Sequence, residues 1–379
     1  MSLPSPAMPL RQVRPLVTAL TLVVVAACSP DQTPLTSADP RDEPRLAAVQ
    51  PPGLTSLLDV TLALPSARVS GNGAVPVVVT IANRGTRTVV VPAWMLPADE
   101  VEEALFVMQR DGQPVAYVGP DVKRGPLQAT DLVRFAGGEV RQYTVDLALA
   151  YDLSGNGSYE VAYAIERGVG NTTYRLQSEK AVFTLSERSG ATTSPVAGAV
   201  PGEVTAQAGS LTYSRCTVTQ QSAIATAVAN ARIYADTATR YLAVQKTEAD
   251  RFKKWFDPAS ATDSWTLAHA NFTKILDGFT SRPIVVDCGC KKTYYAYVYS
   301  NQPYKIFVCK AFWSAPMTGT DSKAGTLIHE MSHFSVVAGT QDYVYGQSLA
   351  ANLAINDAYK ALRNADNHEY FAENTPFLK

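Results

Sequence analysis

Two histidines and a glutamate stand close together in a chain of 379 residues that has only four histidines. His329 and His333 are four positions apart, and Glu330 directly follows the first of them. On a helix this spacing puts both imidazoles on one face, so they can bind one metal ion while the glutamate faces the ion's open coordination position. The pattern predicts a hydrolytic zinc site, in preference to a surface helix whose histidines cap it or pair with neighbouring residues.

A zinc ion in a hydrolase takes three protein ligands and keeps a fourth position open, so one further ligand is required. Metzincins place it six residues after the second histidine, but that position is Gly339, which excludes the class. Asp342 fits better, because Gly339 can end the helix in a left-handed conformation and turn the chain back. A glutamate from a later helix, Glu369 or Glu373, stays open as the alternative.

The motif continues as Gly-Thr-Gln-Asp-Tyr-Val-Tyr-Gly at 339–346, and the whole run resembles the aspzincin signature of deuterolysin-type metalloendopeptidases. Residues 311–316, 318–322 and 364–371 resemble the peptidyl-Lys metalloendopeptidase branch of that family. The resemblance implies one zinc ion, a general base and a hydroxyl that stabilises the tetrahedral intermediate: His329, His333 and Asp342 as ligands, Glu330 as base and Tyr345 as hydroxyl.

Asp366 and Glu369 are candidates for binding a cationic substrate side chain. An ammonium group that leaves water needs an opposite charge, and these carboxylates are three apart, on one face of a helical turn. The resemblance implies that they hold a substrate lysine in the S1′ subsite, with cleavage on its amino side. The other interpretation is a solvent-exposed acidic turn. We expect His368 to be a structural or surface residue and His269 to be a packing residue in a helix, and neither to be a ligand.

The first 53 residues predict an export signal and a tether. Arg11 and Arg14 precede an apolar run at 16–27, which is short for a membrane span but suits a signal peptide, assigned to 1–28. Residues 25–28 resemble a bacterial lipobox in which Cys28 is lipidated, and an ordinary signal peptide is the alternative. With a tether at 29–53, we expect an exported bacterial protein, secreted or a cell-surface lipoprotein.

Residues 54–188 predict an all-β domain. Turn signals separate seven β-rich runs, at 58–64, 75–81, 88–91, 103–108, 143–147, 159–164 and 181–185. This spacing indicates an immunoglobulin-like sandwich, without a cluster of catalytic residue types. We interpret it as a propeptide that assists folding or blocks the active site; a carbohydrate- or surface-binding module is the alternative.

Residues 189–211 have the composition of a linker, and 212–379 would form the zinc metallopeptidase domain. The linker has no lysine, so an enzyme that cuts strictly before lysine cannot release itself there. Helical patterns at 223–244 and 263–279 precede β-like runs at 284–286, 294–299 and 305–308 and the zinc helix, whose apolar face we expect to reach Gly339. This order predicts a mixed α+β fold, and the family resemblance implies that it is zincin-like.

Four of the five cysteines lie in this C-terminal domain, and an even number in an exported domain predicts two disulfides. Three pairings are open from the sequence, and the resemblance favours Cys216 with Cys288 and Cys290 with Cys309. A metal site built from cysteines is the rival interpretation, but the spacing at 288–290 suits zinc poorly.

The net charge of -1 leaves no basic patch for nucleic acid. We expect a monomeric zinc endopeptidase that acts on proteins and peptides, binds its own pro-domain and reaches a membrane only through the lipid on its N-terminus. The alternatives are a deuterolysin-like protease of another specificity and a non-catalytic surface lipoprotein. An inactive relative should have lost a ligand or the base, and all five expected residues are present.

Overall fold

The computed structural model describes residues 58–97, 101–169, 172–189, 209–244, 249–256 and 261–379. All of them belong to one compact unit, Val49–Lys379. The predicted signal peptide, Cys28, the tether and most of the predicted linker lie outside the described residues. Within the described ranges, no helix combines the length and the apolar character that a membrane span requires.

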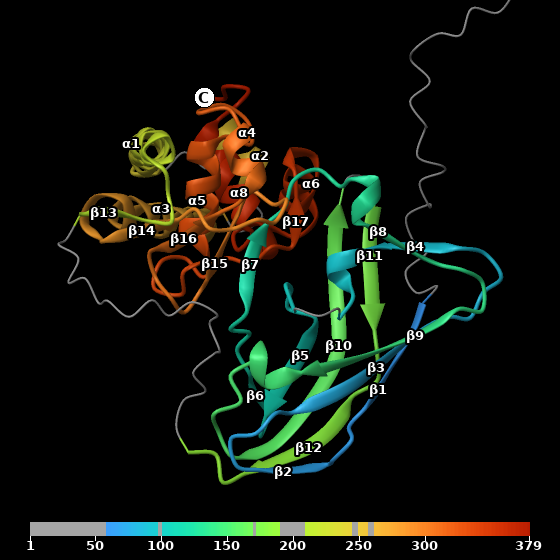
Figure 1. Ribbon diagram of the computed structural model, residues 1–379. Coiled ribbons are helices and arrows are strands. Elements are labelled where there is room, and N and C mark those ends of the chain that lie inside the picture. The colour runs from blue at the N-terminus through green and yellow to red at the C-terminus, as the bar shows by residue number, and fades with distance from the viewer. Residues whose placement is uncertain (1–57, 98–100, 170–171, 190–208, 245–248, 257–260) are drawn as a thin grey trace, which may run out of the picture. The chain divides into compact units, whose positions relative to one another are not determined.

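The described part of the N-terminal region contains twelve strands between residues 58 and 186 (Figure 1). Three of them form an antiparallel sheet: β1 (Leu58–Ala63), β3 (Pro76–Asn83) and β9 (Val140–Asp146). A larger sheet has the order β2 (Arg68–Ser70), β12 (Ala181–Ser186), β10 (Gly157–Val169), β5 (Phe106–Arg110) and β6 (Gln113–Pro114), with β11 (Thr172–Gln177) on β10. A separate pair consists of β4 (Val89–Pro92) and β8 (Leu132–Phe135).

Alternating burial along these strands builds one hydrophobic core. Val77, Val79 and Ile81 of β3 are fully buried, as are Tyr159 and other inward-facing residues of β10. Each of the seven predicted β-rich runs overlaps a strand. Five strands were not predicted, because they are short or polar: β2, β6, β8, β11 and β7 (Pro120–Lys123). The immunoglobulin-like topology stays a prediction.

The C-terminal region has its own core and a mixed sheet. The sheet order is β13 (Leu211–Ser214), β14 (Ile284–Asp287), β16 (Lys305–Val308), β15 (Ala296–Tyr299) and β7, the last of which comes from the N-terminal region. The helices are α1 (Val218–Leu242), α2 (Asp250–Phe256), α3 (Ala261–Ser281), α4 (Lys310–Ser314), α5 (Lys323–His333), α6 (Gln347–Asn356), α7 (Ala358–Ala361) and α8 (Ala365–Glu373). A two-residue strand, β17 (Val344–Tyr345), pairs with β10.

Helix α1 packs closely against α3 and α5 because its buried stripe is mostly alanine, as at Ala227, Ala231 and Ala235. Its first turn is fixed by a capping box between Thr217 and Gln220. Two disulfides tie the sheet to its neighbours, in the pairing that the resemblance implied: Cys216 with Cys288, and Cys290 with Cys309.

The predicted end of the histidine helix was wrong. Helix α5 ends at His333, and Phe334 already has a non-helical backbone with φ of -56° and ψ of 128°. Phe334 and Val337 are still buried, but Val336 is 55% exposed. Apolar spacing could not separate a helix from a turn that packs on the same core. Gly339 does adopt the left-handed conformation, with φ of 59°, and it turns the chain back toward α5.

Candidate active site

Helix α5 is buried along its whole length and is held at its first turn by α8. The Ser322 hydroxyl accepts a hydrogen bond from the backbone N–H of Gly325 at 2.9 Å. Glu373 of α8 in turn accepts hydrogen bonds from the backbone N–H and the hydroxyl of Ser322, at 2.9 and 2.8 Å. This cap anchors α5, and with it the two histidines of its last turn.

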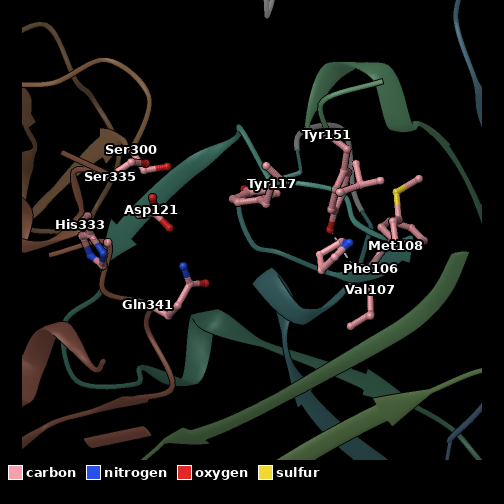
Figure 2. Close-up of a pocket in the computed structure, with 14 residues that line it drawn as sticks. Phe106, Val107, Met108, Tyr117, Asp121, Tyr151, Ser300, His333, Ser335 and Gln341 are labelled. Atoms are coloured by element: carbon pink, nitrogen blue, oxygen red, sulfur yellow. Dashed lines mark hydrogen bonds between the residues drawn. The ribbon is translucent and has the colours of Figure 1, made fainter. Parts of the chain in front are cut away.

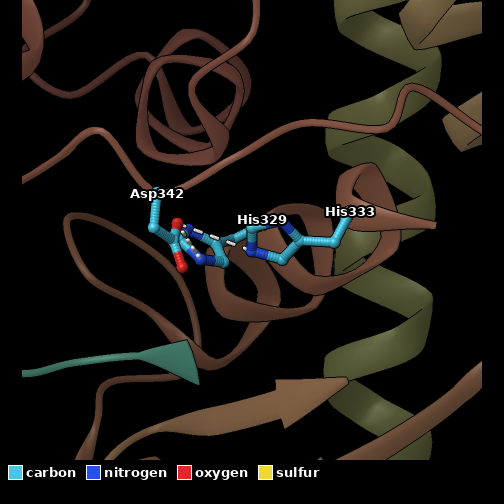
Figure 3. A group of neighbouring side chains, drawn as sticks. All are labelled: His329, His333 and Asp342. Carbon is cyan, nitrogen blue, oxygen red and sulfur yellow. Dashed lines mark ion pairs between the residues drawn. The ribbon is translucent and has the colours of Figure 1, made fainter. Parts of the chain in front are cut away.

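Three side chains meet at the end of α5 (Figure 3). Asp342 Oδ1 lies 3.2 Å from His329 Nε2 and 3.5 Å from His333 Nε2. Each of the three residues offers one donor atom, and these atoms lie within 4.8 Å of one another. All three residues are buried. The structure therefore brings together the three residues that were expected as zinc ligands.

The other nitrogen of each imidazole lies close to an oxygen atom that favours a proton on Nδ1. His333 Nδ1 donates to the Thr340 carbonyl at 2.9 Å, and Thr340 is fixed in turn by its contact with Ser332. His329 Nδ1 faces Asp366 Oδ1 at 2.9 Å. With the proton on Nδ1 in both rings, the two Nε2 atoms keep their lone pairs for a metal ion.

The centre fits a divalent cation. Among the residues that the structure describes, the Nε2 atoms of both histidines and both oxygens of Asp342 are buried without a hydrogen bond. Burial lowers the pKa of His333 to about 4, so its ring is a neutral donor. Burial opposes charge on His329, but the carboxylates of Asp342 and Asp366 raise its pKa well above the ordinary value. Zinc takes imidazole and carboxylate donors of this kind.

Glu330 is fully buried beside the histidines, and neither of its carboxylate oxygens has a hydrogen-bond partner in the described part of the chain. Burial raises its pKa well above the usual value, and the nearby carboxylate of Asp342 adds to this effect. A buried carboxyl group with a raised pKa can both take and return a proton, which suits a general base.

Tyr345 lies on β17, and its side chain is also buried. Its hydroxyl is 3.1 Å from the carbonyl oxygen of Val122 and 3.2 Å from Glu103 Oε1, two acceptors in the N-terminal region. Burial, together with the charges of Asp342 and Glu103, raises the pKa of Tyr345 well above its usual range, so the hydroxyl is a hydrogen-bond donor.

Asp366 and Glu369 lie on α8 with almost no exposure, so the interpretation as a solvent-exposed turn is wrong. Both contact the ammonium group of Lys123, which is itself buried: Nζ is 2.5 Å from Glu369 Oε2 and 3.3 Å from Asp366 Oδ1. Asp321 lies 3.8 Å from the same nitrogen. The acidic pocket, defined by Asp366, Glu369 and Asp321, is thus occupied by a lysine side chain.

Charge in the acidic pocket is shared between a cation and several carboxylates. Burial disfavours the charged form of Lys123, yet Asp366, Glu369 and Asp321 raise its pKa well above the usual value. Burial also opposes ionisation of Asp366, but Lys123 and His329 lower its pKa. The sequence did not predict the contact between Asp366 and His329. The only signal in the sequence was that Asp366 lies in the run 364–371, which resembles the family.

The remaining candidates are structural. His368 is buried between the rings of Phe256 and Phe272, and its Nδ1 donates to the Asn364 carbonyl at 3.0 Å. It is therefore a core residue and not a surface residue. Glu373 accepts hydrogen bonds from Ser322, the N-cap residue of α5. Glu369 approaches His329 only at Nδ1, at 3.4 Å. Neither glutamate reaches the side of the ring that faces Asp342, where a third ligand is needed.

Strand β7 brings Lys123 to the acidic pocket by joining the edge of the C-terminal sheet. It runs antiparallel to β15, with Lys123 opposite Ala296 and Val122 opposite Tyr297. The Lys123 carbonyl accepts from the Tyr295 N–H at 3.0 Å. On the other side of Val122, Asp121 and Tyr117 help to line a pocket that reaches His333 and Gln341 (Figure 2). An extended segment added to a sheet edge is a common mode of peptide binding.

Comparison with known proteins gives consistent matches. The family model for lysine-specific metallo-endopeptidases, the aspzincins, matches residues 241–373. An extracellular protease of Aeromonas hydrophila is 43% identical over 78% of this chain and 87% of its own length. Peptidyl-Lys metalloendopeptidases of Armillaria mellea and Grifola frondosa are 32% and 34% identical, over 79% and 81% of this chain and 87% and 90% of their own lengths. A solved zinc peptidase from Grifola frondosa, 42% identical, covers 43% of this chain and 100% of that chain with a TM-score of 0.41.

Proposed function

The chain belongs to the aspzincin family of metalloendopeptidases, and from that premise we propose that it is an exported zinc endopeptidase that hydrolyses proteins on the amino side of lysine, made as a precursor. The observation that carries this proposal is the convergence of three buried donor atoms, from His329, His333 and Asp342, beside the unpartnered carboxyl group of Glu330. Export accords with the extracellular relative from Aeromonas hydrophila.

His329, His333 and Asp342 would hold the zinc ion. A bound zinc ion supplies Lewis acidity, which polarises a carbonyl group and makes a water molecule easier to deprotonate at neutral pH. Asp366 and the Thr340 carbonyl keep the two imidazoles in the tautomer that this binding requires.

The reacting protons would be moved by Glu330. It would take a proton from the attacking water and then return it to the nitrogen of the leaving amine. The Tyr345 hydroxyl would donate a hydrogen bond to the substrate carbonyl oxygen, and this bond strengthens as negative charge grows on the oxygen. The present contact of Tyr345 with a peptide carbonyl, that of Val122, supports this role.

Preference for lysine would come from the acidic pocket. The ammonium group of a substrate lysine in this pocket would contact Asp366 and Glu369, as the Lys123 ammonium group does in the structure. A neutral side chain in the same place would leave buried carboxylates without a counter-charge, which disfavours it. The peptidyl-Lys relatives named above support the same preference.

The N-terminal β-rich region would act as a pro-domain that blocks the active site. Its strand β7 lies on β15, and its Lys123 fills the acidic pocket, so a second peptide cannot bind in the same place. The predicted signal peptide with its lipobox and most of the predicted linker lie outside the described residues, so lipidation of Cys28 stays a prediction.

Digestion of a protein mixture by the processed protein, followed by mass spectrometry of the peptides, tests the function. We expect new N-termini at lysine. The Glu330→Gln variant should bind zinc like the wild type, measured by elemental analysis, and produce no new peptides. His269→Ala alters a histidine on α3 that belongs to neither group of possible metal ligands, and it should change neither result. Turnover by Glu330→Gln at the wild-type rate would exclude the assigned base.

A further inference from the structure

The hydroxyl of Tyr345 faces two acceptors at nearly the same distance. Val122 offers its carbonyl oxygen at 3.1 Å and Glu103 offers Oε1 at 3.2 Å. A phenol has one proton, so it cannot make a full hydrogen bond to both acceptors. A hydrogen bond to a charged carboxylate is roughly twice as strong as one to a neutral carbonyl. The Glu103 carboxylate therefore competes strongly for the Tyr345 hydroxyl, which the Val122 carbonyl would need as a hydrogen-bond donor during attack by water.

Glu103 is firmly positioned for this competition. It is 4% exposed, and its two oxygens pair with different arginines of the N-terminal domain: Oε1 with Arg124 Nε at 3.1 Å, and Oε2 with Arg167 at 3.0 Å. The Arg124 guanidinium in turn stacks on the ring of Trp94, 4.7 Å from its centroid. These contacts leave the carboxylate little freedom to move away from Tyr345.

The other acceptor is part of a well-placed peptide bond. Val122 directly precedes Lys123, whose ammonium is held in the acidic pocket, so its carbonyl is the one that an endopeptidase cutting before lysine would attack. Pairing with β15 fixes the direction of the strand, because Val122 lies opposite Tyr297 and Lys123 opposite Ala296. The Val122–Lys123 bond thus occupies the position of a scissile bond.

We propose that Glu103 is a latch: it engages the Tyr345 hydroxyl and so slows the precursor's hydrolysis of its own Val122–Lys123 bond. The inference rests on the proposed function. In the cut, a water oxygen adds to the Val122 carbonyl carbon, the C–N bond breaks, and the Lys123 nitrogen leaves with a proton. The products are a Val122 carboxylate and a Lys123 amine. Glu103 acts through Tyr345 and is a positioning residue.

A cut at the Val122–Lys123 bond also explains how maturation can begin although the predicted linker has no lysine. Residues 189–211 contain no lysine, so an enzyme with a strict preference cannot begin its maturation there. The bond before Lys123 satisfies that preference and already lies at the active site. The first cut therefore falls inside the N-terminal domain, in a strand that it contributes to the C-terminal sheet.

Intact-mass analysis and N-terminal sequencing of the full-length precursor over time test the latch. The first new ends should be Val122 and Lys123, and Glu103→Gln should speed their appearance by about tenfold or more, since one oxyanion donor is worth about 10²–10³ in rate. Glu160→Gln is the control, because Glu160 pairs with Lys180 at 2.7 Å on the N-terminal sheet and should leave the rate unchanged. A first cut elsewhere, or an unchanged rate in Glu103→Gln, overturns the proposal.

Loosened packing of the N-terminal domain could also speed the cut, and two measurements separate it from the latch. In the Tyr345→Phe background Glu103→Gln should not accelerate the cut, because the hydroxyl for which Glu103 competes is absent. An acceleration equal to that seen with Tyr345 present overturns the proposal. In the Glu330→Gln background a fluorescent lysine peptide should stay excluded from the Glu103→Gln precursor, as from the precursor with native Glu103. Admission of the peptide would show that the change merely opens the active site.

Comparing the digestion of added substrates with the first cut of the precursor distinguishes failure of the latch from failure of the proposed function. A protein that digests added substrates before lysine, but whose precursor is first cut elsewhere, retains the function and loses the latch. A protein that never cuts before lysine loses both. Peptide binding with Glu330→Gln does not depend on turnover, so replacement of Lys123 by Met should admit the lysine peptide in either case. Continued exclusion by that variant would show that Lys123 does not block the pocket.

Discussion

The two acids of α8 should fail in different ways when each is truncated to alanine. Asp366 contacts both the His329 ring and the pocket cation, at 2.9 and 3.3 Å, whereas Glu369 makes its shortest contact with the cation. Asp366→Ala should therefore weaken both zinc binding and lysine recognition, and Glu369→Ala should weaken mainly lysine recognition. The two residues are equally buried, so the substitutions form a matched pair.

The size of each effect follows from these contacts. Removing one partner of a buried ion pair costs about 3–5 kcal/mol. For Glu369→Ala, Asp366 and Asp321 remain near the cation, so we take the lower end, which corresponds to about a hundredfold loss in kcat/KM for lysine substrates. Loss of the carboxylate that orients a metal-binding histidine lowers metal affinity about 10–100-fold, and this loss is expected for Asp366→Ala alone.

Both quantities can be measured on the processed protein. Zinc affinity is obtained by competition with a chromophoric chelator, and selectivity from kcat/KM for two peptides that differ only in lysine or norleucine after the cleaved bond. Equal zinc affinity in Asp366→Ala and Glu369→Ala would refute the assignment of a second role to Asp366. Full retention of lysine selectivity in Glu369→Ala would refute the acidic pocket as the source of specificity.

Three further outcomes are expected. Removal of zinc by a chelator should abolish hydrolysis and lower the thermal midpoint, because buried donors lose their partner, and added zinc should restore both; hydrolysis that persists without metal would contradict the centre. Gly325→Ala should lower the free energy of unfolding in urea by about 1–3 kcal/mol, since its Cβ would lie 2.0 Å from Glu373 Oε1; an unchanged midpoint would mean that α8 can yield. Replacing Cys290 and Cys309 together by alanine should cost about 3 kcal/mol in the same assay, as expected for a 19-residue separation, and no loss would show that the loop is ordered without the bond.

Local sequence spacing predicted which three side chains meet at the end of α5, because their arrangement depends on a short stretch of chain. His329 and His333 share one face of a helix by periodicity alone, and Gly339 is free to take the left-handed conformation that returns Asp342 to them. The same reasoning failed at the end of α5, where Phe334 and Val337 stay in the core after the helix has stopped. Apolar spacing indicates which residues are buried and not where a helix ends, and buried residues continue past the end of α5.

Contacts between distant parts of the chain could not be predicted in this way. Lys123 and Glu369 are 246 positions apart, and nothing in the composition around Lys123 marks it as a buried residue. Strand β7 is four residues long and carries an aspartate and a lysine, so it lacks the apolar alternation by which a strand is recognised. Its place is set by the free edge of β15 and by the acidic pocket, which are both properties of the folded C-terminal region.

Occupation of the acidic pocket by Lys123 also bears on how the site is assembled. Two carboxylates that are buried side by side repel each other, and an enclosed cation offsets that repulsion. In the structure Lys123 provides this cation, so Asp366 can stay ionised and favour the His329 tautomer that would leave Nε2 for a metal ion. After Lys123 leaves, water or a substrate lysine must take its place. Under the proposed function, the side chain that blocks the active site therefore also stabilises the charges on which metal binding would depend.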